Sequence, residues 1–247
     1  MNVLRIEHLY KAFGSLVVTD DFNLALAGGE RHVIIGPNGA GKTSLINQIG
    51  GQLRPGSGRI FVKDREVTGS SPNQISRMGV ARTFQRNNVF QNLSVIENLR
   101  LALEVRVGNP LDFFSAVGCN ASLLTRAAEL MAQVHLEGDG TRIARNLSYG
   151  EQRQLEIAIA LAGEPELLLL DEPTSGMSPA ETARMIGLIG SLPRTLTVLM
   201  IEHDMQVVFS VADRITVLYY GQLLASGTPA EIRANARVRE VYLGMVH

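Results

Sequence analysis

Apolar residues in the first 35 positions come in short runs that alternate with polar residues or cluster, with glycine-containing turns between them. The runs are residues 3–6, 17–19 and 22–26, and the turns are Gly14-Ser15 and Gly28-Gly29. Short runs separated by tight turns are typical of antiparallel strands. Residues 59–62 follow another glycine turn and are interpreted as a strand of the same sheet. The pattern predicts an antiparallel sheet at the start of the chain.

Other runs are apolar with little alternation, which is typical of parallel strands buried on both faces of a sheet. They are residues 32–35, 80–84, 167–170 and 197–201. Helical periodicity follows the first of them, over residues 44–49. Residues 214–220 and 222–226 flank Gly221 as a hairpin, and a final helix begins near Pro229. The sequence therefore predicts an α/β fold with a phosphate-loop, RecA-like parallel core.

Residues 86–154 have a helical pattern instead. Ser94 and Glu97 form a capping box that opens one helix, and residues 122–134 repeat apolar positions at helical spacing. We interpret the chain as a single domain, with a core and antiparallel subdomain at 1–85 and 155–247. Residues 86–154 form an inserted helical subdomain in this interpretation.

Residues 36–43 read Gly-Pro-Asn-Gly-Ala-Gly-Lys-Thr and lie between a strand and a helix, the context of a phosphate-binding loop. Its glycines can adopt backbone angles that let successive N–H groups curl around an anion. Lys42 adds positive charge for the outer phosphates, and the Thr43 hydroxyl can ligate Mg²⁺. A glycine-rich surface turn is the alternative. The residues expected to contact a nucleoside triphosphate are Gly36, Pro37, Asn38, Gly39, Ala40, Gly41, Lys42, Thr43 and Ser44.

Two carboxylates, Asp171 and Glu172, end the apolar run at 167–170. Ligands of open α/β sheets sit at the carboxyl ends of parallel strands. Asp171 is placed to hold the hydration shell of Mg²⁺, and Glu172 to polarise the attacking water. His203 follows the run at 197–201 and could donate to the terminal phosphate. A solvated strand end is the alternative for the acids.

Ser148 and Glu151 form a second capping box, which places a helix start at Ser148. Gly150 leaves that start sterically bare, so its hydroxyl and N–H groups are suited to an anion. Phe13 lies beside a turn, where its ring could stack on a nucleotide base, although a core position is an equal alternative. Gln85 ends a strand and could ligate a metal or remain a solvated loop residue.

Charge and hydropathy narrow the function classes. The net charge is −1, which argues against an electrostatic nucleic-acid footprint. No apolar run approaches the roughly 18 residues that cross a bilayer, so we expect any membrane role to come through a partner. The single cysteine, Cys119, fits a reducing compartment.

Together these motifs resemble the nucleotide-binding subunits of ATP-binding-cassette transporters, and Leu-Ser-Tyr-Gly-Glu-Gln at 147–152 is the most specific of them. The resemblance implies ATP and Mg²⁺ as ligands. It makes residues 36–43 the Walker A loop and Phe13 the adenine-stacking position. Gln85 becomes the Q-loop residue that ligates Mg²⁺ and contacts the membrane partner.

The same resemblance makes Asp171 the Walker B aspartate, Glu172 the catalytic base and His203 the switch histidine. Residues 148–152, including Ser148, Gly150 and Glu151, become the signature that grips a triphosphate held by a second subunit, in a homodimer or heterodimer. Ser178 stands where the family usually has an acidic or amide residue in the D-loop. That difference puts communication between the two sites in doubt.

At finer grain the chain resembles the ATPase subunits of branched-chain amino-acid importers, in segments such as Ala-Arg-Thr-Phe-Gln at 81–85. The resemblance implies permease partners at the cytoplasmic face of the membrane and, indirectly, a periplasmic or extracellular binding protein. Urea or amide importers and exporters or lipid-extraction systems are the alternatives. A soluble cassette acting on nucleic acid or ribosomes is less favoured, because heptads and a basic excess are lacking.

Overall fold

The computed structural model describes residues 1–83, 89–107 and 121–241. It divides into two compact units. The first contains residues 1–82, 166–173 and 193–247, and the second contains residues 83–165 and 174–192. The second unit includes residues 155–165 and 174–192, which the sequence interpretation assigned to the core. The reason is that α5 (Tyr149–Ala162) continues past residue 154 and packs on α6 (Pro179–Ser191).

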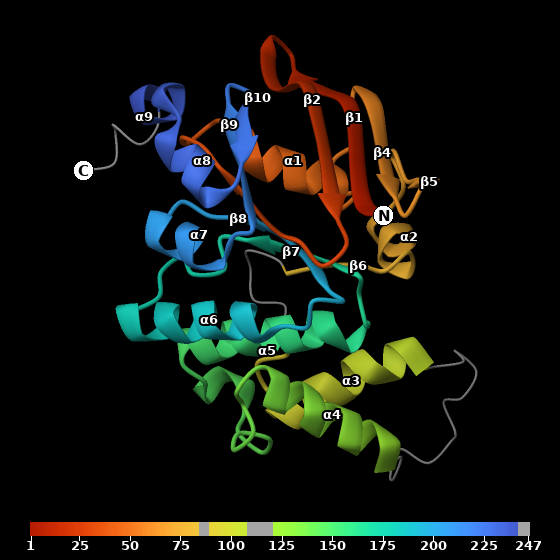
Figure 1. Cartoon of the computed structure of the whole chain (residues 1–247). Coiled ribbons are helices and arrows are strands. Elements are labelled where there is room, and N and C mark those ends of the chain that lie inside the picture. The colour runs from red at the N-terminus through yellow and green to blue at the C-terminus, as the bar shows by residue number, and fades with distance from the viewer. Residues whose placement is uncertain (84–88, 108–120, 242–247) are drawn as a thin grey trace. The chain divides into compact units, whose positions relative to one another are not determined.

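The first unit holds two sheets (Figure 1). In the antiparallel sheet the order is β2-β1-β4-β5, and in the other it is β10-β9-β3-β8-β7-β6. The strands of the first sheet are β1 (Asn2–Phe13), β2 (Leu16–Ala27), β4 (Ser57–Val62) and β5 (Arg65–Glu66). Those of the second are β3 (Arg31–Ile35), β6 (Val80–Arg82), β7 (Leu167–Asp171), β8 (Thr197–Ile201), β9 (Arg214–Tyr219) and β10 (Gln222–Gly227).

The predicted antiparallel sheet and parallel core are confirmed. The neighbours β3, β6, β7, β8 and β9 pair in parallel, and β10 adds an antiparallel edge. One detail differs: the runs at 17–19 and 22–26 belong to the single strand β2. Asp21, with a φ of 45°, interrupts its regular geometry, and the register with β1 shifts near this residue. Such a bulge changes the alternation that the sequence pattern relies on.

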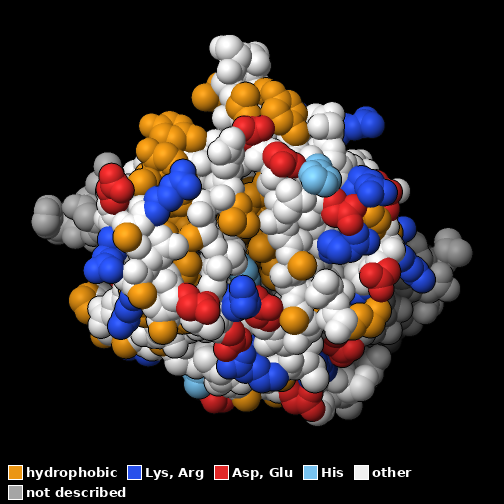
Figure 2. All heavy atoms as spheres, turned by 45° about the horizontal axis from the view of Figure 1, so that its top comes forward, with side chains coloured by type: hydrophobic (Ala, Val, Ile, Leu, Met, Phe, Trp, Pro, Cys, Tyr) orange, Lys and Arg blue, Asp and Glu red, His pale blue; other side chains and the backbone are white. Residues whose placement is uncertain are grey.

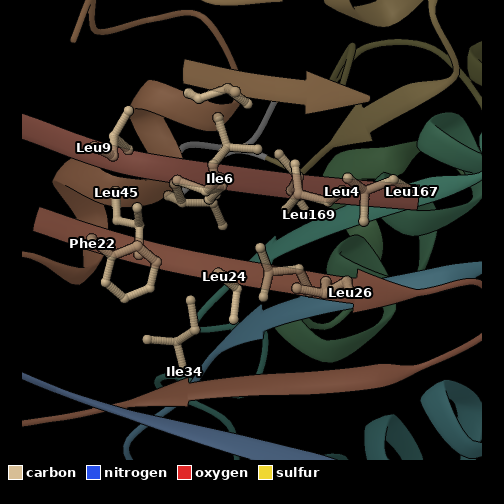
Figure 3. Packing of buried hydrophobic residues seen from close by; sticks show 14 of the residues in the cluster. Leu4, Ile6, Leu9, Phe22, Leu24, Leu26, Ile34, Leu45, Leu167 and Leu169 are labelled. Carbon is tan, nitrogen blue, oxygen red and sulfur yellow. The ribbon is translucent and has the colours of Figure 1, made fainter. Parts of the chain in front are cut away.

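The helices of the first unit are α1 (Lys42–Ile49), α2 (Pro72–Arg77), α7 (Met205–Val211), α8 (Pro229–Ala234) and α9 (Ala236–Val241). A core of buried apolar residues joins β1 and β2 to α1 and to the inner strands (Figure 3). Phe22, Leu45 and Ile34 come from these three layers and are fully buried. This packing holds both ends of the loop between β3 and α1, because apolar side chains of both flanking elements are part of the core.

The second unit is helical among its described residues. Besides α5 and α6 it contains α3 (Val95–Val107), α4 (Ala121–Gln133) and a 3-10 turn at Ala144–Asn146. Helices α3, α4 and α5 pack on one another. The predicted capping boxes at Ser94 and Ser148 are confirmed, because Glu97 and Glu151 each accept from the backbone N–H of the serine.

Charged side chains of both signs are interspersed over the face that Figure 2 shows. Hydrophobic side chains gather at its upper edge. Phe13, Leu16 and Val17, on either side of the turn between β1 and β2, are exposed. None of the helices in the described ranges is long and apolar enough to cross a membrane.

Candidate nucleotide site

The loop between β3 and α1 has the backbone geometry of an anion cradle. Gly36, Gly39 and Gly41 have φ angles of 154°, 79° and 102°. A Cβ on Gly36 would lie 2.1 Å from the Leu218 carbonyl oxygen, and one on Gly41 would lie 2.0 Å from that of Val18. Glycine is therefore required at both positions by backbone packing. No side chain caps the start of helix α1. The first backbone N–H groups of the helix therefore face the loop without a side-chain acceptor.

The side chain of Lys42, at the end of this loop, reaches back to its first residues. Its Nζ donates to the carbonyl oxygens of Gly36, at 2.7 Å, and Pro37, at 3.0 Å. Burial lowers the pKa of Lys42, and the charges of Glu172 and Asp171 oppose that shift. The ammonium is thus held at the mouth of the cradle, where phosphate oxygens could replace the carbonyl oxygens as its acceptors.

Asp171 ends β7 and is buried. Its Oδ2 lies 3.3 Å from a guanidinium nitrogen of Arg82, whereas its Oδ1 is buried without a hydrogen-bond partner. Burial raises the pKa of Asp171, and the nearby Arg82 charge opposes that shift. A buried carboxylate oxygen without a donor fits a hydrated cation, because water or metal can supply the missing contact. This observation supports Mg²⁺ beside Asp171.

Within the described residues no cluster of three or more His, Cys, Asp or Glu side chains could hold a metal. Mg²⁺ is commonly held by one or two protein oxygens together with substrate phosphates. The residues present therefore fit a cation that arrives with a nucleotide. Gln85, the other proposed ligand, lies outside the described residues.

Glu172 and His203 meet because β7 and β8 are paired neighbours. Asp171 is in register with Ile201, and the Glu172 N–H donates to the Ile201 carbonyl oxygen at 3.0 Å. Glu172 has a φ of 48°, a conformation that is uncommon for a residue with a side chain. His203 Nδ1 lies 3.9 Å from Glu172 Oε1. Both side chains remain partly exposed, so a water molecule could reach them.

Arg82 is a site residue that the sequence analysis missed. Besides Asp171 it contacts Asn47 Oδ1 at 2.7 Å and Gln52 Oε1 at 2.8 Å. It reaches Asp171 because β6 pairs in parallel with β7, with Arg82 in register with Leu169. The sequence pattern that could have revealed it is an arginine inside a strand predicted to be in the core. A charge in that position needs a buried partner. Its guanidinium holds one oxygen of Asp171 in place.

Phe13 ends β1 beside the Gly14 turn and is 51% exposed, which rules out the core alternative. Lys11 Nζ lies 5.3 Å from the centre of the ring. An exposed aromatic face in the same unit as the loop is suited to stack on a base.

The signature segment lies in the second unit. Ser148 caps α5, its Oγ accepts from the Glu151 N–H at 3.3 Å, and Glu151 is paired with Arg142. The Gly150 N–H donates to Glu181 Oε1 at 3.1 Å. The helix start is therefore where the sequence predicted it, but the N–H groups of Gly150 and Glu151 are engaged in internal bonds rather than free.

Comparison with known proteins agrees with this geometry. The family model described as ABC transporter matches residues 19–175. The model described as branched-chain amino acid ATP-binding cassette transporter matches residues 222–244.

Individual proteins match along nearly the whole chain. The chain is similar to the high-affinity branched-chain amino acid transport ATP-binding protein LivG of Escherichia coli K12, at 40% identity over 98% of each chain. It is 33% identical to the lipopolysaccharide export system ATP-binding protein LptB of Acidithiobacillus ferridurans, over 98% of this chain and 97% of the relative. Among solved structures it resembles the ADP conformation of MJ1267, an ATP-binding cassette of an ABC transporter, with a TM-score of 0.86, 29% identity and 99% of both chains covered. The chain belongs to the ABC transporter family and is one of its ATP-hydrolysing cassettes.

Proposed function

We propose that this chain is the ATPase subunit that powers import of branched-chain amino acids through permease subunits at the cytoplasmic face of the membrane. The hydrolytic part rests on one observation: the cradle at residues 36–41, Lys42 and the two acids at the end of β7 belong to one compact unit. The solute class rests on the match at residues 222–244 and on the similarity to LivG. An indirect role for an extracytoplasmic binding protein is part of the same proposal.

Each side chain has a role in this proposal. The backbone N–H groups of residues 36–44, apart from Pro37, which has none, bind the phosphates together with the Lys42 ammonium, and Phe13 stacks on the adenine. Thr43, Gln85 and Asp171 would hold Mg²⁺, which would neutralise phosphate charge when bound.

Hydrolysis itself is assigned to the strand ends. Glu172 accepts a proton from the attacking water, and His203 orients Glu172 and donates to the terminal phosphate. Ser148, Gly150 and Glu151 contact the triphosphate held by a second cassette subunit, which is either a copy of this chain or a sibling.

A stacking role for Phe13 predicts a specific loss. Phe13→Ala should weaken ATP binding by about ten-fold, because base stacking on an aromatic ring contributes about 1–3 kcal/mol. Phe13→Tyr should bind ATP normally, and Leu16→Ala serves as the control for an exposed apolar residue of the same turn. Titration with a fluorescent ATP analogue measures the affinities. Equal affinities for Phe13→Ala and the wild type would remove Phe13 from the site.

The transport role is tested with the chain assembled with its permease subunits in proteoliposomes. We expect Mg-ATP-dependent uptake of radiolabelled leucine, isoleucine or valine in the presence of the binding protein, and faster ATP hydrolysis during uptake. A second candidate, lipid export, is favoured only by the similarity to LptB. Urea uptake, or stimulation by lipopolysaccharide without amino-acid uptake, would contradict the proposed substrate class.

A further inference from the structure

One carboxylate joins the starts of two helices in the second unit. Glu181, in the first turn of α6, accepts through Oε1 from the Gly150 N–H of α5 at 3.1 Å. Its Oε2 accepts from the Ser178 N–H at 3.0 Å and from the Ser178 hydroxyl at 2.8 Å. The two oxygens of Glu181 therefore serve different helices.

The contact with α5 is close. A Cβ on Gly150 would lie 3.0 Å from both Cγ and Oε1 of Glu181. Glycine at position 150 therefore lets the carboxylate approach the backbone of the helix start. The hydrogen bonds from Ser178 and then that from Gly150 lower the pKa of Glu181 to about 2, so that Glu181 is an anion at neutral pH.

This arrangement differs from that of a simple cap. Thr228 and Glu231 form the same kind of box at the start of α8, with Glu231 Oε2 at 2.7 Å from the Thr228 N–H. The hydrogen bonds described for Glu231 stay within its own box. Glu181 reaches a second helix, at the N–H of the signature glycine. Capping of α6 alone does not require that bond.

The Gly150 N–H is a single donor, and helix starts attract anions of any origin. A triphosphate and the Glu181 carboxylate cannot both accept its hydrogen bond. Both are negatively charged, so they would repel each other if both lay beside this N–H. We propose that Glu181 occupies the anion site of the signature helix in the absence of nucleotide and must yield the Gly150 N–H to the triphosphate held by the partner cassette. Glu181 is thus a positioning residue. It sets the ATP concentration at which the two cassettes close on the nucleotide between them. The inference rests on the proposed function of residues 148–151.

The same switch involves the D-loop. The Ser178 hydroxyl is engaged in the cap of α6 and in its bond to Glu181. When Oε1 of Glu181 leaves Gly150, Oε2 can stay with Ser178, so the link between the D-loop and α5 is broken while α6 stays capped.

The test uses the transporter assembled with its membrane subunits and carrying Glu172→Gln, so that bound ATP is not hydrolysed. Radiolabelled ATP that is retained after rapid washing reports the closed state, in which the two cassettes hold ATP between them. We expect Glu181→Gln, and likewise Glu181→Ala, to lower the ATP concentration for half-maximal retention by about ten-fold, the equivalent of one charge-assisted hydrogen bond. Glu231→Gln is the matched control and should leave it unchanged. The affinity of the isolated chain for a fluorescent ATP analogue should be the same in all variants.

The possible results distinguish a failure of this inference from a failure of the proposed function. If the parent retains ATP but Glu181→Gln shifts nothing, the role of Glu181 is overturned and the proposed function stands. If the parent retains no ATP at any concentration, the proposed function fails and this inference with it. Ser178→Ala weakens the cap of α6 without removing the charge; if it lowers the ATP requirement as much as Glu181→Gln does, the effect comes from α6 stability and the inference is wrong.

Discussion

Replacing Glu172 by glutamine will lower the rate of ATP hydrolysis by at least about 100-fold and leave ATP affinity nearly unchanged, because the amide cannot accept the proton of the attacking water. The position supports this role. The backbone bond to Ile201 fixes the residue at the end of β7, and its carboxylate lies near His203. Phosphate release by the assembled transporter measures the rate.

The control for this prediction is Glu166→Gln. Glu166 lies just before β7, at the opposite end of the strand, where it pairs with Lys63. Its loss removes one exposed ion pair, which contributes at most about 1 kcal/mol to stability. Hydrolysis by Glu166→Gln should match that of the wild type. Rapid turnover in Glu172→Gln would show that another group accepts the proton.

Replacing Gly41 by alanine will abolish nucleotide binding and destabilise the chain by about 2–4 kcal/mol. The new Cβ would stand 2.0 Å from the Val18 carbonyl oxygen, and the φ of 102° is one that side chains rarely adopt. Because Val18 belongs to β2, whose apolar face is packed in the core, the loop must move instead of the strand. The cradle at the start of α1 would then be lost. Urea denaturation and titration with a fluorescent ATP analogue measure the two effects.

Gly14→Ala is the control, because it introduces backbone strain without the steric overlap of Gly41→Ala. Gly14 has a φ of 58°, and no atom lies within 4 Å of the Cβ that alanine would add. We expect a loss of about 1 kcal/mol in the free energy of unfolding. Equal losses for the two variants would mean that contact with Val18 does not constrain the loop.

Local patterns predicted the elements of this chain well. The apolar run at 167–170 became the buried strand β7, and Ser148 with Glu151 marked the start of α5. Such signals depend on residues a few positions apart, so the sequence contains them in full. The glycine-rich loop also carries its own explanation, since its spacing and its place between strand and helix are both local.

Contacts between distant segments could not be predicted in this way. Arg82 meets Asp171 only through the pairing of β6 with β7. Phe13 is exposed at the end of β1, beside the turn to β2. Glu181 looks from the sequence like an ordinary capping residue. Its second bond, to Gly150, arises from the packing of α5 on α6.

By itself, the sequence determined the chemistry of this protein: a phosphate-binding loop, a carboxylate pair at a strand end and a capped helix with a bare glycine. Only the tertiary structure decided which of these groups are already occupied. The physical reason is that hydrogen-bond donors and buried carboxylates are satisfied by whatever neighbour the packing brings near. Asp171 keeps one oxygen without a donor, whereas the Gly150 N–H is held by Glu181.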